Sequence, residues 1–120
     1  AMKYMAKSKV VLIAGGLGKP GFTTDTAVVA QAFELHCEAV VKTTKVNGIY
    51  TKDPELDSSA TRYERLSYEQ ALQNPDIKVM DKAAIALAAD KKIKVIVCES
   101  NSDSVLAVLG GDTTKGTIVG

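Results

Sequence analysis

Residues 10–25 read VVLIAGGLGKPGFTTD, an apolar run followed by a glycine-rich segment and a polar end. The run at 10–13 is continuous and rich in β-branched residues, which is typical of a strand buried on both faces of a parallel sheet. Residues 26–35 carry apolar side chains at helical spacing, and Thr24 or Asp25 can cap the first turn. The stretch therefore predicts a strand, a glycine loop and a helix in succession.

The same alternation continues along the chain. A capping box, Ser67 with Gln70, precedes one of the later helices. Further strands are expected at 39–41, within 63–66, at 95–98 and at 117–119, and further helices at 68–73, from about 81, and at 103–109. Strands that alternate with helices indicate an α/β fold, a three-layer αβα sandwich with a mainly parallel sheet. Its 120 residues are expected to form a single domain.

Composition excludes several classes of function. The 15 lysines and arginines nearly balance the 14 aspartates and glutamates, so no overall field draws the chain to nucleic acid or to an anionic membrane. Neither a membrane span nor a signal peptide is apparent, and we expect a soluble, cytoplasmic protein. Cys37 and Cys98 lack metal-ligand spacing, and we expect each to be a buried thiol.

The glycine loop has the chemistry of a phosphate site. Backbone N–H groups at the start of a helix attract anions, and Thr23 and Thr24 add hydroxyl donors. The loop is neither a Walker A motif nor GxGxxG. Composition alone leaves open that the glycines only form a turn. Asp25 would repel a phosphate unless a metal ion or a lysine offsets its charge, and this requirement points to phosphoryl transfer.

Four stretches, in order, carry a family resemblance. They are GGLGKPGFTTDTA, VVKTTKVNGIYTKDP, YERLSYEQAL with IKVMDKAAIALA, and KVIVCESNSDSVLAVLGGDTTKGTIV. Together they cover nearly the whole chain, and they resemble the UMP kinases of the amino acid kinase family. The resemblance implies transfer of the γ-phosphoryl group of ATP to UMP, giving UDP for pyrimidine nucleotide synthesis.

The resemblance also implies roles for individual residues. Thr44, Tyr50 and Asp53 would contact ATP, and Asp25 would organise the transfer site as the catalytic carboxylate. Mg²⁺ would bridge the ATP phosphates, and no residue is assigned as a metal ligand. The loop that binds UMP would comprise Leu17, Gly18, Lys19, Pro20, Gly21, Phe22, Thr23 and Thr24.

Some of these residues can also be interpreted without the resemblance. The ring of Tyr50 offers a flat face to a base, and Lys42 and Lys45 bring positive charge to the same strand end. On the residues alone, the pair at 47–48 is an ordinary turn and Tyr50 a strand residue. Asp81 is expected to be the N-cap of its helix, with no catalytic role.

Family members begin with an N-terminal half that carries a further phosphate loop, which this sequence lacks. The resemblance therefore implies the C-terminal, ATP-side part of the fold, and we expect residues 1–120 alone to be a poor kinase. It further implies a homo-oligomer, typically a hexamer, with no nucleic-acid or membrane partner. Two alternatives stay open, namely a non-catalytic nucleotide-binding or assembly fragment, and a family member that acts on a carboxylate or carbamate.

Overall fold

The structure is a computed structural model, and it describes residues 2–14, 24–77 and 80–120. The helices are α1 (Met2–Met5), α2 (Thr24–Glu34), α3 (Tyr68–Gln73), α4 (Lys82–Lys91) and α5 (Ser102–Leu109), with a 3-10 turn, η1, at Thr113–Lys115. The strands are β1 (Ala39–Thr44), β2 (Arg65–Leu66), β3 (Lys94–Glu99) and β4 (Gly116–Val119). None of the described helices is both long and apolar enough to cross a bilayer.

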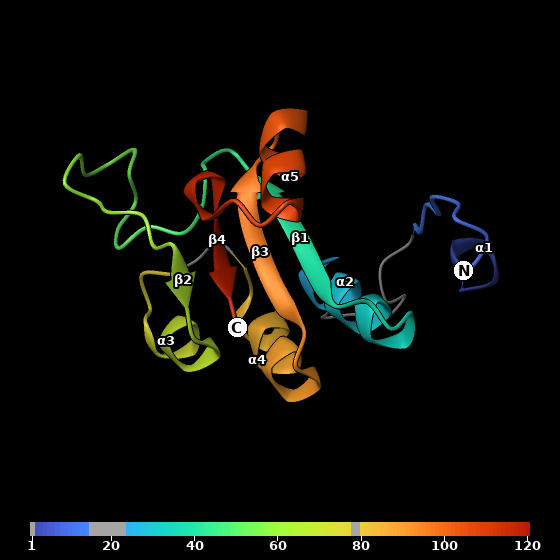
Figure 1. The fold of residues 1–120 in the computed structure, drawn as a ribbon. Helices are drawn as coiled ribbons and strands as arrows, with labels where there is room; N and C mark the ends of the chain where they lie inside the picture. The colour runs from blue at the N-terminus through green and yellow to red at the C-terminus, as the bar shows by residue number, and fades with distance from the viewer. Residues whose placement is uncertain (1, 15–23, 78–79) are drawn as a thin grey trace.

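The four strands form one sheet in the order β1-β3-β4-β2 (Figure 1). β1 pairs with β3 in parallel, with Val40 opposite Val95, and β2 pairs with β4 in parallel. Only the central β3–β4 pair is antiparallel. The expected α/β fold with a mainly parallel sheet is confirmed, with one antiparallel pairing in it.

Helices cover both faces of this sheet. Successive residues of a strand point to opposite faces, so Val97 and Cys98 of β3 lie on different sides. Val97 belongs to the buried cluster that includes residues of α2, α3 and α4. Cys98 is paired with Gly116, where an added Cβ would lie 2.9 Å from Val108 of α5. Helix α5 therefore covers the face opposite α2, α3 and α4, which gives the three expected layers.

Several local signals in the sequence are reproduced. The capping box at Ser67 is present, because its hydroxyl accepts from the Gln70 N–H and the Gln70 side chain accepts from the Ser67 N–H. Asp81 is the N-cap of α4, although its side chain makes no capping hydrogen bond. Helix α2 starts at Thr24, so Thr24 and Asp25 lie within its first turn instead of before it.

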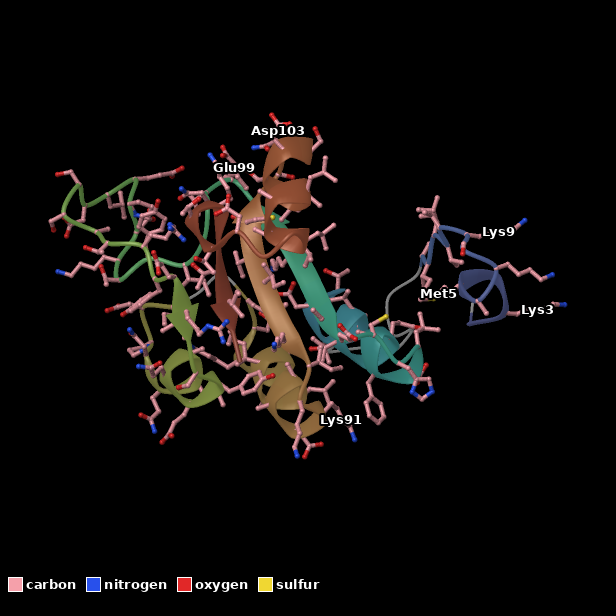
Figure 2. The ribbon with its side chains drawn as sticks, in the orientation of Figure 1. Lys3, Met5, Lys9, Lys91, Glu99 and Asp103 are labelled. Carbon is pink, nitrogen blue, oxygen red and sulfur yellow. The ribbon has the colours of Figure 1, made fainter. Side chains whose placement is uncertain are left out.

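The prediction of a strand at residues 10–13 is wrong for this structure. Residues 9–14 carry no strand, and the side chains of Val10 and Leu12 are 95% and 96% exposed. An apolar β-branched run reports strand propensity, but a strand also needs a neighbour for its backbone hydrogen bonds. None of the four strands of the sheet pairs with this segment. Figures 1 and 2 show it with α1, Lys3 and Lys9, set apart from the sheet.

The two cysteines differ in burial. Cys98 is fully buried in β3, as expected, and burial raises the pKa of its thiol. Cys37 is only half-buried, packed at the margin of the core, so the expectation of a second buried thiol is wrong. Cys37 lies in the loop that follows α2, where it packs against the core cluster without being enclosed by it.

One buried hydroxyl joins the sheet to the loop that follows β1. Thr117 of β4 is fully buried, and its Oγ1 accepts from the Ile49 N–H at 2.9 Å and donates to the Tyr63 carbonyl. A Cβ added at Gly48 would lie 2.5 Å from this oxygen. The close approach of residues 48 and 117 therefore depends on a glycine at one and a small hydroxyl side chain at the other.

We predict that Thr117→Val destabilises the fold. Valine keeps the shape but leaves the buried Ile49 N–H without its acceptor, which costs about 1–3 kcal/mol, and leaves the Tyr63 carbonyl with only the 3.5 Å hydrogen bond from Arg62. Urea unfolding of the two proteins measures the difference. Thr43→Val, at an exposed position of β1, is the matched control and should change stability by about 0.5 kcal/mol or less. Equal stability of Thr117→Val and the unaltered chain would contradict the assignment.

Candidate functional site

The predicted UMP loop lies mostly outside the part of the chain that the structure describes. Leu17, Gly18, Lys19, Pro20, Gly21, Phe22 and Thr23 fall among residues 15–23, so their roles stay predictions. Thr24 is described and is the first residue of α2. The place where this loop enters the helix is therefore fixed, and the site can be built from there.

Asp25, in the first turn of α2, is held by groups from two other elements. One carboxylate oxygen lies 2.6 Å from Nζ of Lys42 in β1. The other accepts from the backbone N–H of Asp81, the N-cap of α4, at 3.2 Å. The N-termini of α2 and α4 thus meet at one carboxylate beside β1. Both helix ends carry partial positive charge, and a lysine adds a full one.

Lys42 lies on the face of the sheet that α2 and α4 cover. Val40 is buried on that face, and residues 42 and 44 share it because side chains alternate along a strand. Thr44, predicted to contact ATP, is therefore two residues further along the same face, at the carboxyl end of β1. Ligands of open α/β sheets bind at this end of parallel strands. Strand β1 thus carries Lys42, the partner of Asp25, and ends at Thr44, the first of the predicted ATP residues.

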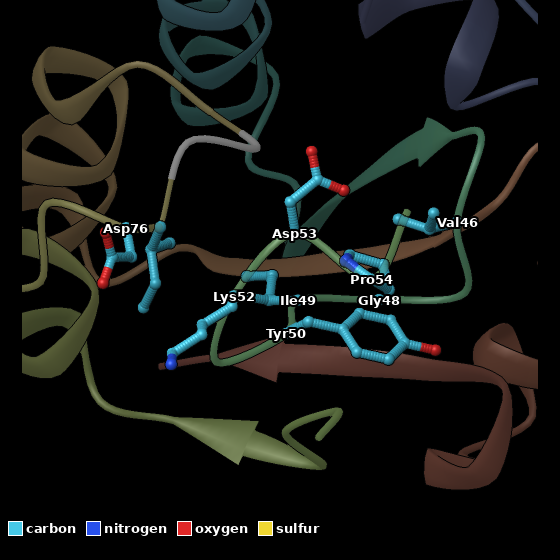
Figure 3. Close-up of a pocket in the computed structure, with 9 residues that line it drawn as sticks. Val46, Gly48, Ile49, Tyr50, Lys52, Asp53, Pro54 and Asp76 are labelled. Atoms are coloured by element: carbon cyan, nitrogen blue, oxygen red, sulfur yellow. The ribbon is translucent and has the colours of Figure 1, made fainter. Parts of the chain in front are cut away.

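A pocket of about 240 Å³ opens just beyond β1 (Figure 3). The predicted ATP residues Tyr50 and Asp53 both line it, whereas Thr44 and Asp25 do not. The other residues of its wall are Val46, Gly48, Ile49, Lys52, Pro54, Asp76 and Ile77. A neighbouring hollow of about 410 Å³ shares Lys52, Asp53 and Asp76 with it.

The described charged groups that line this pocket are mainly acidic. Among the lining residues that the structure describes, Asp53 and Asp76 are accompanied by one cation, Lys52. In the neighbouring hollow, hydrogen bonds from the hydroxyl and the backbone N–H of Ser59 hold the pKa of Asp57 below its usual value. Carboxylates suit the hydroxyl and amino groups of a nucleoside better than a polyphosphate chain. The described lining therefore suits neutral hydroxyl and amino groups better than phosphate groups.

Arg62 fixes the loop that forms the pocket wall. Tyr50 and Arg62 form an isolated antiparallel bridge, and the Tyr50 hydroxyl donates to the side chain of Asn47. The Arg62 guanidinium donates to the carbonyl of Thr113 at 2.9 Å and to the carbonyl of Gly116. One side chain thereby ties the base of the loop to β4 and to the turn before it.

Sequence reasoning found some of these residues and missed others. Lys42 was noted as a positive charge, but nothing in the sequence joined it to Asp25, seventeen positions earlier. Asp76 and Ile77 reach the pocket from the turn after α3, and only the folded chain brings them there. The Asn74-Pro75 pair signals the end of α3, yet it gives no sign that the following residues meet Tyr50.

A metal ion is the other group that could offset the charge of Asp25. In residues 2–14, 24–77 and 80–120, no three His, Cys, Asp or Glu side chains are grouped so that they could hold one. Both oxygens of Asp25 already have partners, Lys42 and the Asp81 N–H.

The profile of the amino acid kinase family matches residues 1–99. The chain belongs to the amino acid kinase family. Among curated relatives, the uridylate kinase of Rhodopseudomonas palustris is 48% identical over 120 residues, which are 99% of this chain and 50% of that protein. The uridylate kinase of Azorhizobium caulinodans is 44% identical over 119 residues, with 99% and 50% covered. The chain thus spans about half the length of the curated relatives it matches.

Solved structures give the same family. The UMP kinase from Bacillus anthracis superposes with a TM-score of 0.92 at 29% identity, covering 98% of this chain and 48% of that one. Aspartokinase III from Escherichia coli, in complex with aspartate and ADP, has a TM-score of 0.66 at 28% identity, covering 87% of this chain and 21% of that one. The family therefore includes similar structures that differ in substrate.

We predict that Arg62→Met loosens the pocket loop without unfolding the core. Loss of charge-assisted hydrogen bonds worth about 1.5–3 kcal/mol should speed hydrogen exchange of the Thr51 and Tyr63 amides by about 10-fold or more. Both amides donate across the base of the loop. The amide of Ile93, in the core, should exchange as before.

Arg65→Met, at an exposed position of β2, is the matched control for the loss of an arginine. It should leave all three amides unchanged. Uniform acceleration of the three amides in Arg62→Met would mean that Arg62 stabilises the whole fold, contrary to the assignment.

Proposed function

We propose that this chain forms the ATP-side part of a UMP kinase, which transfers the γ-phosphoryl group of ATP to UMP. One geometric observation supports it above all. The N-termini of α2 and α4 and the ammonium group of Lys42 converge on Asp25, beside the strand whose end opens into a nucleoside-sized pocket. Identity of 44% and 48% to proteins named uridylate kinase favours UMP as the acceptor.

In the proposed site each segment has a distinct task. Residues 17–24 bind the phosphate and part of the nucleoside of UMP. Thr44, Tyr50 and Asp53 bind ATP, with the base against the ring of Tyr50 and the ribose hydroxyls donating to carboxylates of the pocket wall. The ATP phosphates then extend from the acidic pocket towards Lys42 and the two helix N-termini, where positive charge is concentrated.

The reaction asks little covalent chemistry of the protein. A phosphate oxygen of UMP attacks the γ-phosphorus, a new P–O bond forms, and the bond from the γ-phosphorus to the bridging oxygen of ADP breaks. Because the second pKa of a phosphate monoester is about 6, the attacking oxygen is already deprotonated near neutral pH. Catalysis then rests on in-line positioning and on charge neutralisation, to which Mg²⁺ on the ATP phosphates contributes when bound.

A second candidate is phosphorylation of a carboxylate. The structural similarity to an aspartokinase with bound aspartate and ADP favours it, because the ATP-side half could serve either acceptor. The Thr23-Thr24-Asp25 sequence before and within α2 resembles the nucleotide acceptor loop and supports UMP instead.

We predict that a chimera has UMP kinase activity when this chain replaces the segment it matches in the Rhodopseudomonas palustris relative. ADP release coupled to NADH oxidation measures turnover, with UMP, CMP and aspartate as competing acceptors. UMP should be preferred, and residues 1–120 alone should be at least about 100-fold slower, since the site would lack groups that neutralise charge. Turnover with aspartate but not with UMP would establish the second candidate in place of the first.

We predict that the pocket beyond β1 binds the base of ATP. Tyr50→Ala removes the ring and should weaken ATP binding by about 10-fold, since stacking on an aromatic ring is worth about 1–3 kcal/mol per base. Isothermal titration calorimetry of the chimera measures the dissociation constant. Tyr50→Phe, which keeps the ring and loses only the hydroxyl bonded to Asn47, is the control and should change it by less than about 3-fold. Unchanged affinity in Tyr50→Ala would place the base elsewhere.

A further inference from the structure

Lys42 occupies an unusual position for a charged residue. It lies on the face of β1 that α2 and α4 cover, next along that face from the buried Val40, and its side chain is only 27% exposed. Withdrawing an ammonium group from water is costly, and an apolar side chain of similar volume is often at least as stabilising at such a position. Packing alone therefore does not account for a lysine here.

The partner of Lys42 is equally constrained. Asp25 is 18% exposed, and its two oxygens are engaged by different elements, one by the Lys42 ammonium and one by the Asp81 N–H. The start of α4 is itself anchored, because the Lys82 ammonium donates to the carbonyls of Ala71 and Asn74 at the end of α3. The Asp25 carboxylate thus sits between a cation and a fixed helix N-terminus.

From this arrangement we propose that Lys42 is a positioning residue for phosphoryl transfer and acts through Asp25. It holds the carboxylate against the start of α4 and offsets its negative charge, so that phosphate groups can approach the N-terminus of α2. The inference rests on the proposed function. It adds that Lys42 allows the Asp25 carboxylate to lie beside two phosphorylated substrates.

Charge accounts for the expected consequence. An uncompensated carboxylate a few ångströms from a phosphate repels it strongly in a partly buried site. With Lys42 in place, the pair is neutral overall, and the partial positive charges of two helix ends remain to attract anions. Without Lys42, the negative charge of Asp25 opposes the binding of UMP even in a protein that is otherwise correctly folded.

A double-mutant cycle in the chimera separates this role from a structural one. The variants are Lys42→Met, Asp25→Asn, the double variant and Lys42→Arg, with Lys94→Met as the control for loss of an exposed lysine at the other end of the β1–β3 ladder. Calorimetry gives the dissociation constant of UMP, the coupled assay gives kcat and KM, and thermal unfolding monitors the fold.

We expect Lys42→Met to weaken UMP binding by about 10-fold or more and to lower kcat by about 100-fold. Adding Asp25→Asn should restore UMP affinity to within about 3-fold of the unaltered chimera, because the repulsive charge is removed. The value of kcat should stay low, because the same substitution removes the carboxylate that organises the transfer site. Lys42→Arg should keep most of the affinity, and Lys94→Met should match the unaltered protein. A purely structural lysine would give no such restoration.

Two results would overturn the inference alone: unchanged UMP affinity and kcat in Lys42→Met, or a double variant that binds UMP no better than Lys42→Met. Should Lys42→Met fail to fold, Asp25→Asn is compared with the double variant. Once Asp25 is neutral, loss of Lys42 should no longer weaken UMP binding. A double variant that binds UMP more weakly than Asp25→Asn counts against the inference. An unaltered chimera that neither binds nor phosphorylates UMP would overturn the proposed function and this inference with it.

Discussion

The parallel pairing of β1 with β3 is the constraint on which the remaining architecture depends. Its register, from Ala39 opposite Lys94 to Thr44 opposite Glu99, brings the carboxyl ends of both strands to one edge of the sheet. The segment after β1 must then turn away at that edge and build the pocket wall, and the segment after β3 enters α5 (Figure 2 labels Glu99 and Asp103 at this end). The same register sets Lys42 level with Val97, in reach of α2.

The charge arrangement around Asp25 follows from that geometry. Helices α2 and α4 pack against each other, and both contribute small residues, Ala32, Ala84 and Ala88, to the same buried cluster. Small side chains let the helices approach closely, so that the backbone N–H of one helix cap reaches a carboxylate of the other. The buried alanines and the polar cluster are therefore parts of one packing solution.

Much of the fold could be predicted from sequence because its signals are local. Periodicity, the Ser67 capping box and the strand-like run of β3 all act within a few residues, and each is present in the structure. The signal at residues 10–13 was equally local and was wrong, since a strand also requires a partner that local sequence cannot specify. Asp25 pairs with Lys42, and Asp76 lines the same pocket as Tyr50, only in the folded chain. These are long-range contacts, which local sequence spacing does not predict.

Gly116 determines how closely α5 can pack on the sheet. Its backbone is extended and unstrained, yet an added Cβ would lie 2.7 Å from the Val97 carbonyl oxygen and 2.9 Å from Val108. Any side chain there would act as a wedge between the layer of α5 and the sheet. The space at position 116 therefore has no room for a side chain, and a substitution there would push α5 away from the sheet and so thicken the domain.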